Sequence, residues 1–229
     1  MKYQDRTEAG RVLARALADA HLPDVENATV LGLVRGGVPV AYEVATTLGL
    51  PLDVMIVRKI GAPGNREYAM GAVASGGAIV LNPGVVRDFG VTEERLRHVI
   101  EVQKEEIERL ENLYRQGRPP AEFGEGGVIL VDDGLATGAS MRAAIRAVRP
   151  LAKHVTVAVP VAARSTCAEL SKEVDHMVCA MTPEPLEAVS LFYREFGPTG
   201  DDEVIALLAD ARRRQGIRDC GAQEPSQRT

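Results

Sequence analysis

An apolar run that leads through a short loop into a helix constrains the fold of this chain most strongly. Gly127–Val131 is uninterrupted and apolar, as strands in the middle of parallel sheets are. Asp132 and Asp133 follow it directly, and apolar spacing then predicts a helix over Met141–Val148 that ends before Pro150. A strand followed at once by a helix is typical of a parallel sheet with crossover helices.

The same alternation continues over most of the chain. The expected strands cover 28–34, 52–57, 155–160 and 175–180, and the expected helices cover 7–20 with Thr7 as N-cap, 38–48, 92–116, 165–172 and 201–211. Gly71–Ser75 and Ala78–Asn82 resemble a hairpin with Gly76 and Gly77 in its turn. We therefore expect one α/β domain over residues 1–211 with a mostly parallel central sheet flanked by helices, and a disordered polar tail over 212–229.

The charge balance excludes two classes of partner. Of 229 residues, 27 are Lys or Arg and 32 are Asp or Glu, so the formal net charge is −5. A general binder of nucleic acid or of a membrane surface needs an excess of basic residues, so we expect neither. The chain has no apolar run of the roughly 18 to 20 residues that a membrane span needs, and no signal-peptide pattern at its start, so we expect a cytoplasmic protein.

The cysteines give no sign of a metal or disulfide framework. Cys167, Cys179 and Cys220 are odd in number, form no C-x-x-C pair and have no histidine at zinc-ligand spacing. We expect Cys167 and Cys179 to be ordinary buried or half-buried thiols.

The residues after the central apolar run suit a sugar phosphate. Asp132 and Asp133 stand at the carboxyl end of a predicted parallel strand, where open α/β sheets bind ligands, and paired ribose hydroxyls are suitable partners for two carboxylates. The loop that follows opens a helix, whose free N–H groups and dipole favour a phosphate. Its members are Ala136, Thr137, Gly138, Ala139 and Ser140. In isolation such a loop is more simply a helix cap, but the apolar run and the two acids before it make the pattern more specific.

This combination resembles the type I phosphoribosyltransferase family, whose signature is an apolar strand, two acids and a T-G-x-S/T loop. The resemblance covers about residues 3–210 and includes the N-terminal segment Asp5–Gly10 and the segment Lys59–Val73. It is closest to bacterial and archaeal predicted phosphoribosyltransferases whose acceptors are poorly defined. It implies that fold, with a small hood segment from the N-terminus and about 183–200, and a flexible lid loop at about 60–75.

The resemblance also implies roles for residues outside the central loop. Arg35, Gly36 and Gly37 match a loop that binds pyrophosphate, often across a cis peptide; in this chain such a bond would fall at Arg35–Gly36, and whether that bond is cis stays open. The simpler interpretation of the segment is a tight turn. Arg58 and Lys59 match basic residues that reach the pyrophosphate.

Two further sets of residues carry weaker expectations. Lid contacts are expected from Arg66, Glu67 and Tyr68. Phe192 and Tyr193 are candidates for contacts to the acceptor base, and packing is an equally good interpretation of both.

The implied activity is Mg²⁺-dependent transfer of the phosphoribosyl group from 5-phosphoribosyl 1-diphosphate to a nitrogen acceptor, with Asp132 and Asp133 holding the ribose and helping to hold the metal. Family members that act on 6-oxopurines carry an acid just before the Thr-Gly, where this chain has Ala136. A nucleobase other than a 6-oxopurine is therefore the expected acceptor, and adenine, pyrimidine and other acceptors stay open. A donor-sensing regulator and a hydrolase or phosphorylase on the same fold stay open, as does a homodimer.

Overall fold

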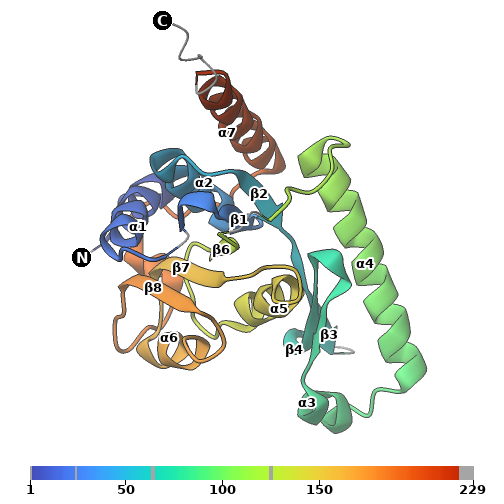
Figure 1. Cartoon of the computed structure of the whole chain (residues 1–229). Helices are drawn as coiled ribbons and strands as arrows, with labels where there is room; N and C mark the ends of the chain where they lie inside the picture. The colour runs from blue at the N-terminus through green and yellow to red at the C-terminus, as the bar shows by residue number, and fades with distance from the viewer. Residues whose placement is uncertain (1, 24, 63–64, 124–125, 222–229) are drawn as a thin grey trace, which may run out of the picture.

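The computed structural model describes residues 2–23, 25–62, 65–123 and 126–221. Five parallel strands form the central sheet in the order β2-β1-β6-β7-β8, which confirms the predicted fold class (Figure 1). They are β1 (Thr29–Leu33), β2 (Leu52–Met55), β6 (Val128–Val131), β7 (Val155–Val161) and β8 (His176–Met181).

Helices cover both faces of this sheet because its central strands are apolar on both sides. Every residue of β1, β6 and β7 is buried. On one face lie α1 (Arg6–Asp19), α2 (Gly37–Leu48) and α7 (Asp201–Gly221). On the other lie α5 (Ala139–Val148) and α6 (Arg164–Leu170), together with a second, smaller sheet.

The second sheet is antiparallel, in the order β3-β4-β5, and joins the central sheet where β2 ends. It consists of β3 (Val57–Ala62), β4 (Asn65–Ala74) and β5 (Ile79–Leu81), and a short turn at Ser75–Gly77 connects the last two as predicted. The hairpin arm predicted over Gly71–Ser75 is the end of β4, but the rest of the lid expected at about 60–75 is not an irregular loop, because its described residues pair as β3 and β4. Its glycines and register shifts at Gly61 conceal the strand alternation, in which Ile60, Ala62 and Met70 are buried.

Two helices flank this sheet, α3 (Pro83–Asp88) and α4 (Glu93–Arg115). The predicted start of α4 is confirmed, since the Thr92 side chain accepts a hydrogen bond from the backbone N–H of Arg95 at 3.3 Å. The predicted cap of α1 is wrong by two residues, because Asp5 and not Thr7 accepts from the N–H of Glu8 at 2.8 Å. Asp is as good an N-cap as Thr, so the pattern alone does not separate the two.

The C-terminal helix is longer than expected. α7 continues to Gly221, so residues 212–221 are helical where we predicted a disordered tail, and residues 222–229 lie outside the described part of the chain. Polarity favours disorder here, but four of the ten residues are Arg, which has high helix propensity. Among the described residues, no helix is both long and apolar enough to cross a bilayer.

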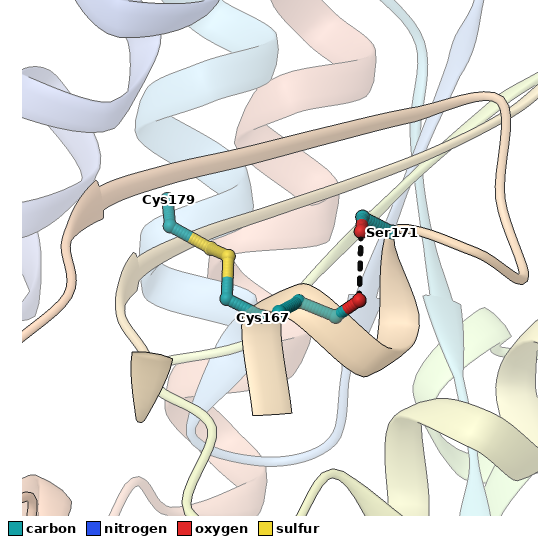
Figure 2. The surroundings of a disulfide bond; sticks show 4 residues. Cys167, Ser171 and Cys179 are labelled. Atoms are coloured by element: carbon teal, nitrogen blue, oxygen red, sulfur yellow. Dashed lines mark hydrogen bonds between the residues drawn. A yellow bond between two sulfur atoms is a disulfide. The ribbon is translucent and has the colours of Figure 1, made fainter. Parts of the chain in front are cut away.

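The structure also corrects the cysteine prediction. Cys167 of α6 and Cys179 of β8 form a disulfide across 12 residues of sequence (Figure 2). The helix passes beside the strand, which brings the two side chains together although their spacing matches no disulfide or metal motif.

A buried ion pair attaches α4 to the central sheet. Arg115 at the end of the helix donates from Nε to both carboxylate oxygens of Asp53 in β2, at 3.1 and 3.0 Å. The side chains are only 7% and 4% exposed. Asp53 also accepts from the backbone N–H groups of Val54 and Ala121, so its charge is well solvated by the protein.

We expect Arg115→Met to lower the free energy of unfolding by about 3–5 kcal/mol, because it leaves the Asp53 carboxylate buried without its cation. Arg109→Met on the same helix is the matched control, since its pair with Glu106 is solvent-exposed and contributes about 0–1 kcal/mol. Urea unfolding measures both variants. Equal losses in the two would contradict this account, and adding Asp53→Asn to Arg115→Met should recover part of the stability.

Candidate functional site

The site is built where the loops after β1 and β6 meet. These strands are neighbours and parallel, so their carboxyl ends lie side by side at one edge of the sheet. The contact is so close that only glycine fits. A Cβ atom on Gly36 would lie 2.2 Å from Oδ2 of Asp133, and one on Gly37 would lie 2.7 Å from the carbonyl oxygen of Val131 and 3.1 Å from Oδ1 of Asp132. The backbone after β1 therefore lies directly against the paired carboxylates.

A cis peptide bond precedes these glycines. It joins Val34 to Arg35, one bond earlier than the Arg35–Gly36 position expected from the sequence. α2 starts at Gly37, and its N-cap Gly36 already has helical backbone geometry. The Arg35 side chain points to the start of α7, with Nη1 3.5 Å from Oδ1 of Asp201.

The loop after β6 ends at the start of α5. Gly138, with a left-handed φ of 70°, is the N-cap of this helix, and a Cβ atom there would lie 2.9 Å from Thr166 Cγ2. The Thr166 hydroxyl also donates to the carbonyl of Ala136 at 2.6 Å, so α6 supports the loop from below. Ala136, Thr137 and Ala139 are exposed and Ser140 is half-buried. The first N–H groups of α5 are free to bind an anion.

The two carboxylates differ in their surroundings. Asp132 accepts from the backbone N–H of Asp133 at 2.9 Å. Burial, and after it the neighbouring Asp133 carboxylate, raises the pKa of Asp132 well above its usual range. Burial also raises the pKa of Asp133, although the Arg6 guanidinium opposes this.

Arg6 is a site residue that the sequence analysis missed. Its Nε donates to Oδ2 of Asp133 at 2.9 Å, with Nη2 2.8 Å from the same oxygen, and its Nη1 donates to the carbonyl of Gly197 at 2.7 Å. The guanidinium also lies 4.0 Å from the centre of the Phe196 ring. The segment Asp5–Gly10 carried the family resemblance, but nothing local in it indicates a partner 127 residues away.

The segments 3–5 and 192–195 pair beside this site. The N–H of Tyr3 donates to the carbonyl of Phe192 at 2.8 Å, and the N–H of Arg194 donates to the carbonyl of Tyr3 at 2.9 Å. The side chain of Tyr193 is buried against the rings of Tyr3 and Phe196 and donates through its hydroxyl to the carbonyl of Asp133 at 2.6 Å.

These contacts bear on the two residues expected to touch an acceptor. Burial raises the pKa of the Tyr193 phenol, which stays protonated and donates to Asp133. The buried Tyr193 side chain holds the backbone at Asp133, and the half-buried Phe192 packs on the same aromatic cluster. The contacts of both residues in this structure are packing contacts, and their expected role at the acceptor stays a prediction.

The basic residues lie on the other side of the glycine loop. Arg35 and Arg58 line one pocket, of about 370 Å³, together with Arg109 of α4. Lys59 is the next residue in β3; its side chain is exposed and lines the adjoining groove. Arg66, Glu67 and Tyr68 fall in β4, but their side chains lie outside the described part of the structure.

The donor set suits Mg²⁺ only in the company of a substrate. Within the described residues, no three His, Cys, Asp or Glu side chains converge on a common point. Asp132 and Asp133 offer two carboxylates, and Mg²⁺ characteristically takes one or two carboxylates together with water and substrate phosphates.

Comparison with known proteins agrees with this arrangement. The family described as "Phosphoribosyl transferase domain" matches residues 2–184. Two proteins from two strains of Mycobacterium tuberculosis, "Putative phosphoribosyl transferase Rv0571c" and "Putative phosphoribosyl transferase MT0597", are each 40% identical to this chain over 227 residues, covering 97% of this chain and 51% of the relative. The chain thus spans about half the length of these relatives. The crystal structure of TT1426 from Thermus thermophilus has a TM-score of 0.75 and 42% identity, covering 92% of this chain and 99% of that one.

The fold and the edge at which its paired carboxylates lie define an α/β protein of the phosphoribosyl transferase class. Because the match covers most of the chain, this protein belongs to the phosphoribosyl transferase domain family, as the sequence resemblance predicted.

We expect Gly36→Ala to displace the Asp133 carboxylate, since the added methyl group would lie 2.2 Å from its oxygen. The overpacking should cost about 1–3 kcal/mol in the free energy of unfolding. Gly216→Ala in α7 is the control, because nothing lies within 4 Å of its Cβ position. Thermal unfolding of both variants checks this, and a Gly36→Ala variant as stable as the wild type would show that the two loops are not packed as described.

Proposed function

We propose that this protein transfers the 5-phosphoribosyl group from 5-phosphoribosyl 1-diphosphate to a nitrogen acceptor, with release of pyrophosphate. The observation that carries the proposal is the contact of Gly36 and Gly37 with Asp133 and Asp132 at the edge of a parallel sheet. It puts a backbone loop suited to pyrophosphate within reach of two carboxylates suited to a ribose diol. Membership of the family supports the same reaction class.

Different residues bind different parts of the donor. The N–H groups at the start of α5 and the hydroxyls of Thr137 and Ser140 hold the 5-phosphate, because a helix N-terminus favours a dianion. Asp132 and Asp133 accept hydrogen bonds from the ribose hydroxyls and favour positive charge on the ring as the bond at C1 breaks. Gly36 and Gly37 let the pyrophosphate approach the backbone, and Arg35 and Arg58 lie beside that loop to balance its charge.

Mg²⁺ is the metal that this chemistry requires. Asp132 and Asp133 would contribute to holding it, and the bound ion would neutralise the pyrophosphate as it leaves. Because two carboxylates are a small share of its ligands, we expect metal and donor to bind together, so that chelation of Mg²⁺ weakens donor affinity.

The residue just before the Thr-Gly of the phosphate loop restricts the choice of acceptor. Ala136 occupies the position at which family enzymes for 6-oxopurines carry an acid, and it is exposed at the mouth of the loop. A methyl group can neither give nor take a proton, so we infer an acceptor other than hypoxanthine or guanine.

We expect the double variant Asp132→Asn, Asp133→Asn to lose about a hundredfold in donor affinity, since it removes two charge-assisted contacts to the ribose. Titration calorimetry with 5-phosphoribosyl 1-diphosphate and Mg²⁺ measures the change. The double variant Asp202→Asn, Glu203→Gln makes the same change in charge on exposed positions of α7 and should bind normally. Unchanged affinity in a folded Asp132→Asn, Asp133→Asn protein would refute the ribose assignment.

A further inference from the structure

A groove between β3 and α4 extends beyond the part of the site that the reaction proposed above uses, and shares Arg58 with it. It has a volume of about 910 Å³ and lies along the outer side of the second sheet, where α4 runs beside β3 (Figure 1). It adjoins the pocket beside the glycine loop, because Arg58, Glu106 and Arg109 line both. The groove is therefore continuous with the pocket beside the glycine loop.

Basic side chains line both walls of this groove. Arg58 and Lys59 come from β3, and Arg95, His98 and Arg109 come from α4. The residues from α4 recur at helical spacing, which places them on one face of the helix. A chain with a net charge of −5 thus gathers cations at this place.

Four arginine and lysine side chains face two acids, Glu105 and Glu106, so the groove keeps an excess of positive charge. Glu106 forms an ion pair with Arg109, with hydrogen bonds of 2.8 and 2.9 Å between the two side chains. Arg58 donates to the neutral side chain of Gln103 at 3.3 Å. Within the described part of the chain, no carboxylate forms an ion pair with Lys59 or Arg95, and Glu105 is the remaining acid on the walls.

The groove also contains an apolar strip. Val99 and Val102 lie on the same face of α4, and Val102 is 43% exposed. Cations on two facing walls suit a chain of phosphates, in which each unit carries a negative charge and several acceptor oxygens. The valines are suited to an attached organic group.

We propose that this groove is a second anion site, which binds the phosphate chain of a small polyphosphorylated molecule. Its ligand is either a free polyphosphate or a nucleoside polyphosphate, which share this chemistry. The site extends beyond the pyrophosphate loop through Arg58, so its occupant and the donor compete for that arginine. The proposal concerns binding and does not require that the protein be a transferase.

The test is titration calorimetry with tripolyphosphate at fixed ionic strength, using two charge reversals on α4. Arg95→Glu changes a wall of the groove, whereas Arg97→Glu makes the same change in charge on an exposed residue that does not line it. Acidic residues are favourable in the first turns of a helix, so both variants should fold. We expect Arg95→Glu to weaken binding by about tenfold or more and Arg97→Glu to leave it within about twofold.

The proposal fails if tripolyphosphate does not bind to the wild type, or if Arg95→Glu and Arg97→Glu weaken binding equally. It also fails if binding is lost only in Thr137→Val, because the anion would then bind at the loop before α5. A comparison with ATP identifies the source of the phosphates. Tighter binding of ATP that weakens in Val102→Ser would assign a nucleoside polyphosphate, and equal affinities would assign the free chain, each in support of the site. If Asp132→Asn, Asp133→Asn leaves donor binding unchanged while Arg95→Glu still weakens tripolyphosphate binding, only the proposed function fails.

Discussion

The close contact between the loops after β1 and β6 is the constraint on which the rest of this structure depends. Two neighbouring parallel strands bring the loops together, and glycine at positions 36 and 37 lets backbone meet carboxylate without a side chain between them. Asp133 is then held between the glycine loop and the Arg6 guanidinium. A buried carboxylate needs such compensation, because desolvation without it would cost several kcal/mol.

That requirement explains why both ends of the domain meet at the site. Arg6 pairs with the Asp133 carboxylate and also contacts Gly197 and Phe196. The Tyr193 hydroxyl donates to the backbone carbonyl of Asp133. The N-terminal segment is thus attached to the segment near 193 by the same contacts that fix the carboxylate. Changes in the aromatic cluster should therefore displace the Asp133 carboxylate before they alter the central sheet.

Local pattern sufficed for the parts of the molecule whose structure is determined locally. The sequence predicts the buried strand before Asp132, the helix after Gly138 and the Thr92 cap, because each depends on a few adjacent residues. The sequence does not predict the contacts of Arg6 and Tyr193 with Asp133, since both lie more than 50 residues from it in the chain. The pattern over 60–67 indicates a loop where β3 and β4 pair, because glycines and register shifts interrupt the alternation there. The disulfide depends on how α6 lies against β8.

The most direct test of the account is the release of pyrophosphate from 5-phosphoribosyl 1-diphosphate with Mg²⁺ across a panel of purine, pyrimidine and other nitrogen acceptors, with donor alone as control. The account predicts release that depends on one acceptor outside the 6-oxopurines. Release from donor alone would indicate a hydrolase, and donor binding without release under any acceptor would favour a sensor; either result would contradict transfer as the function of this site.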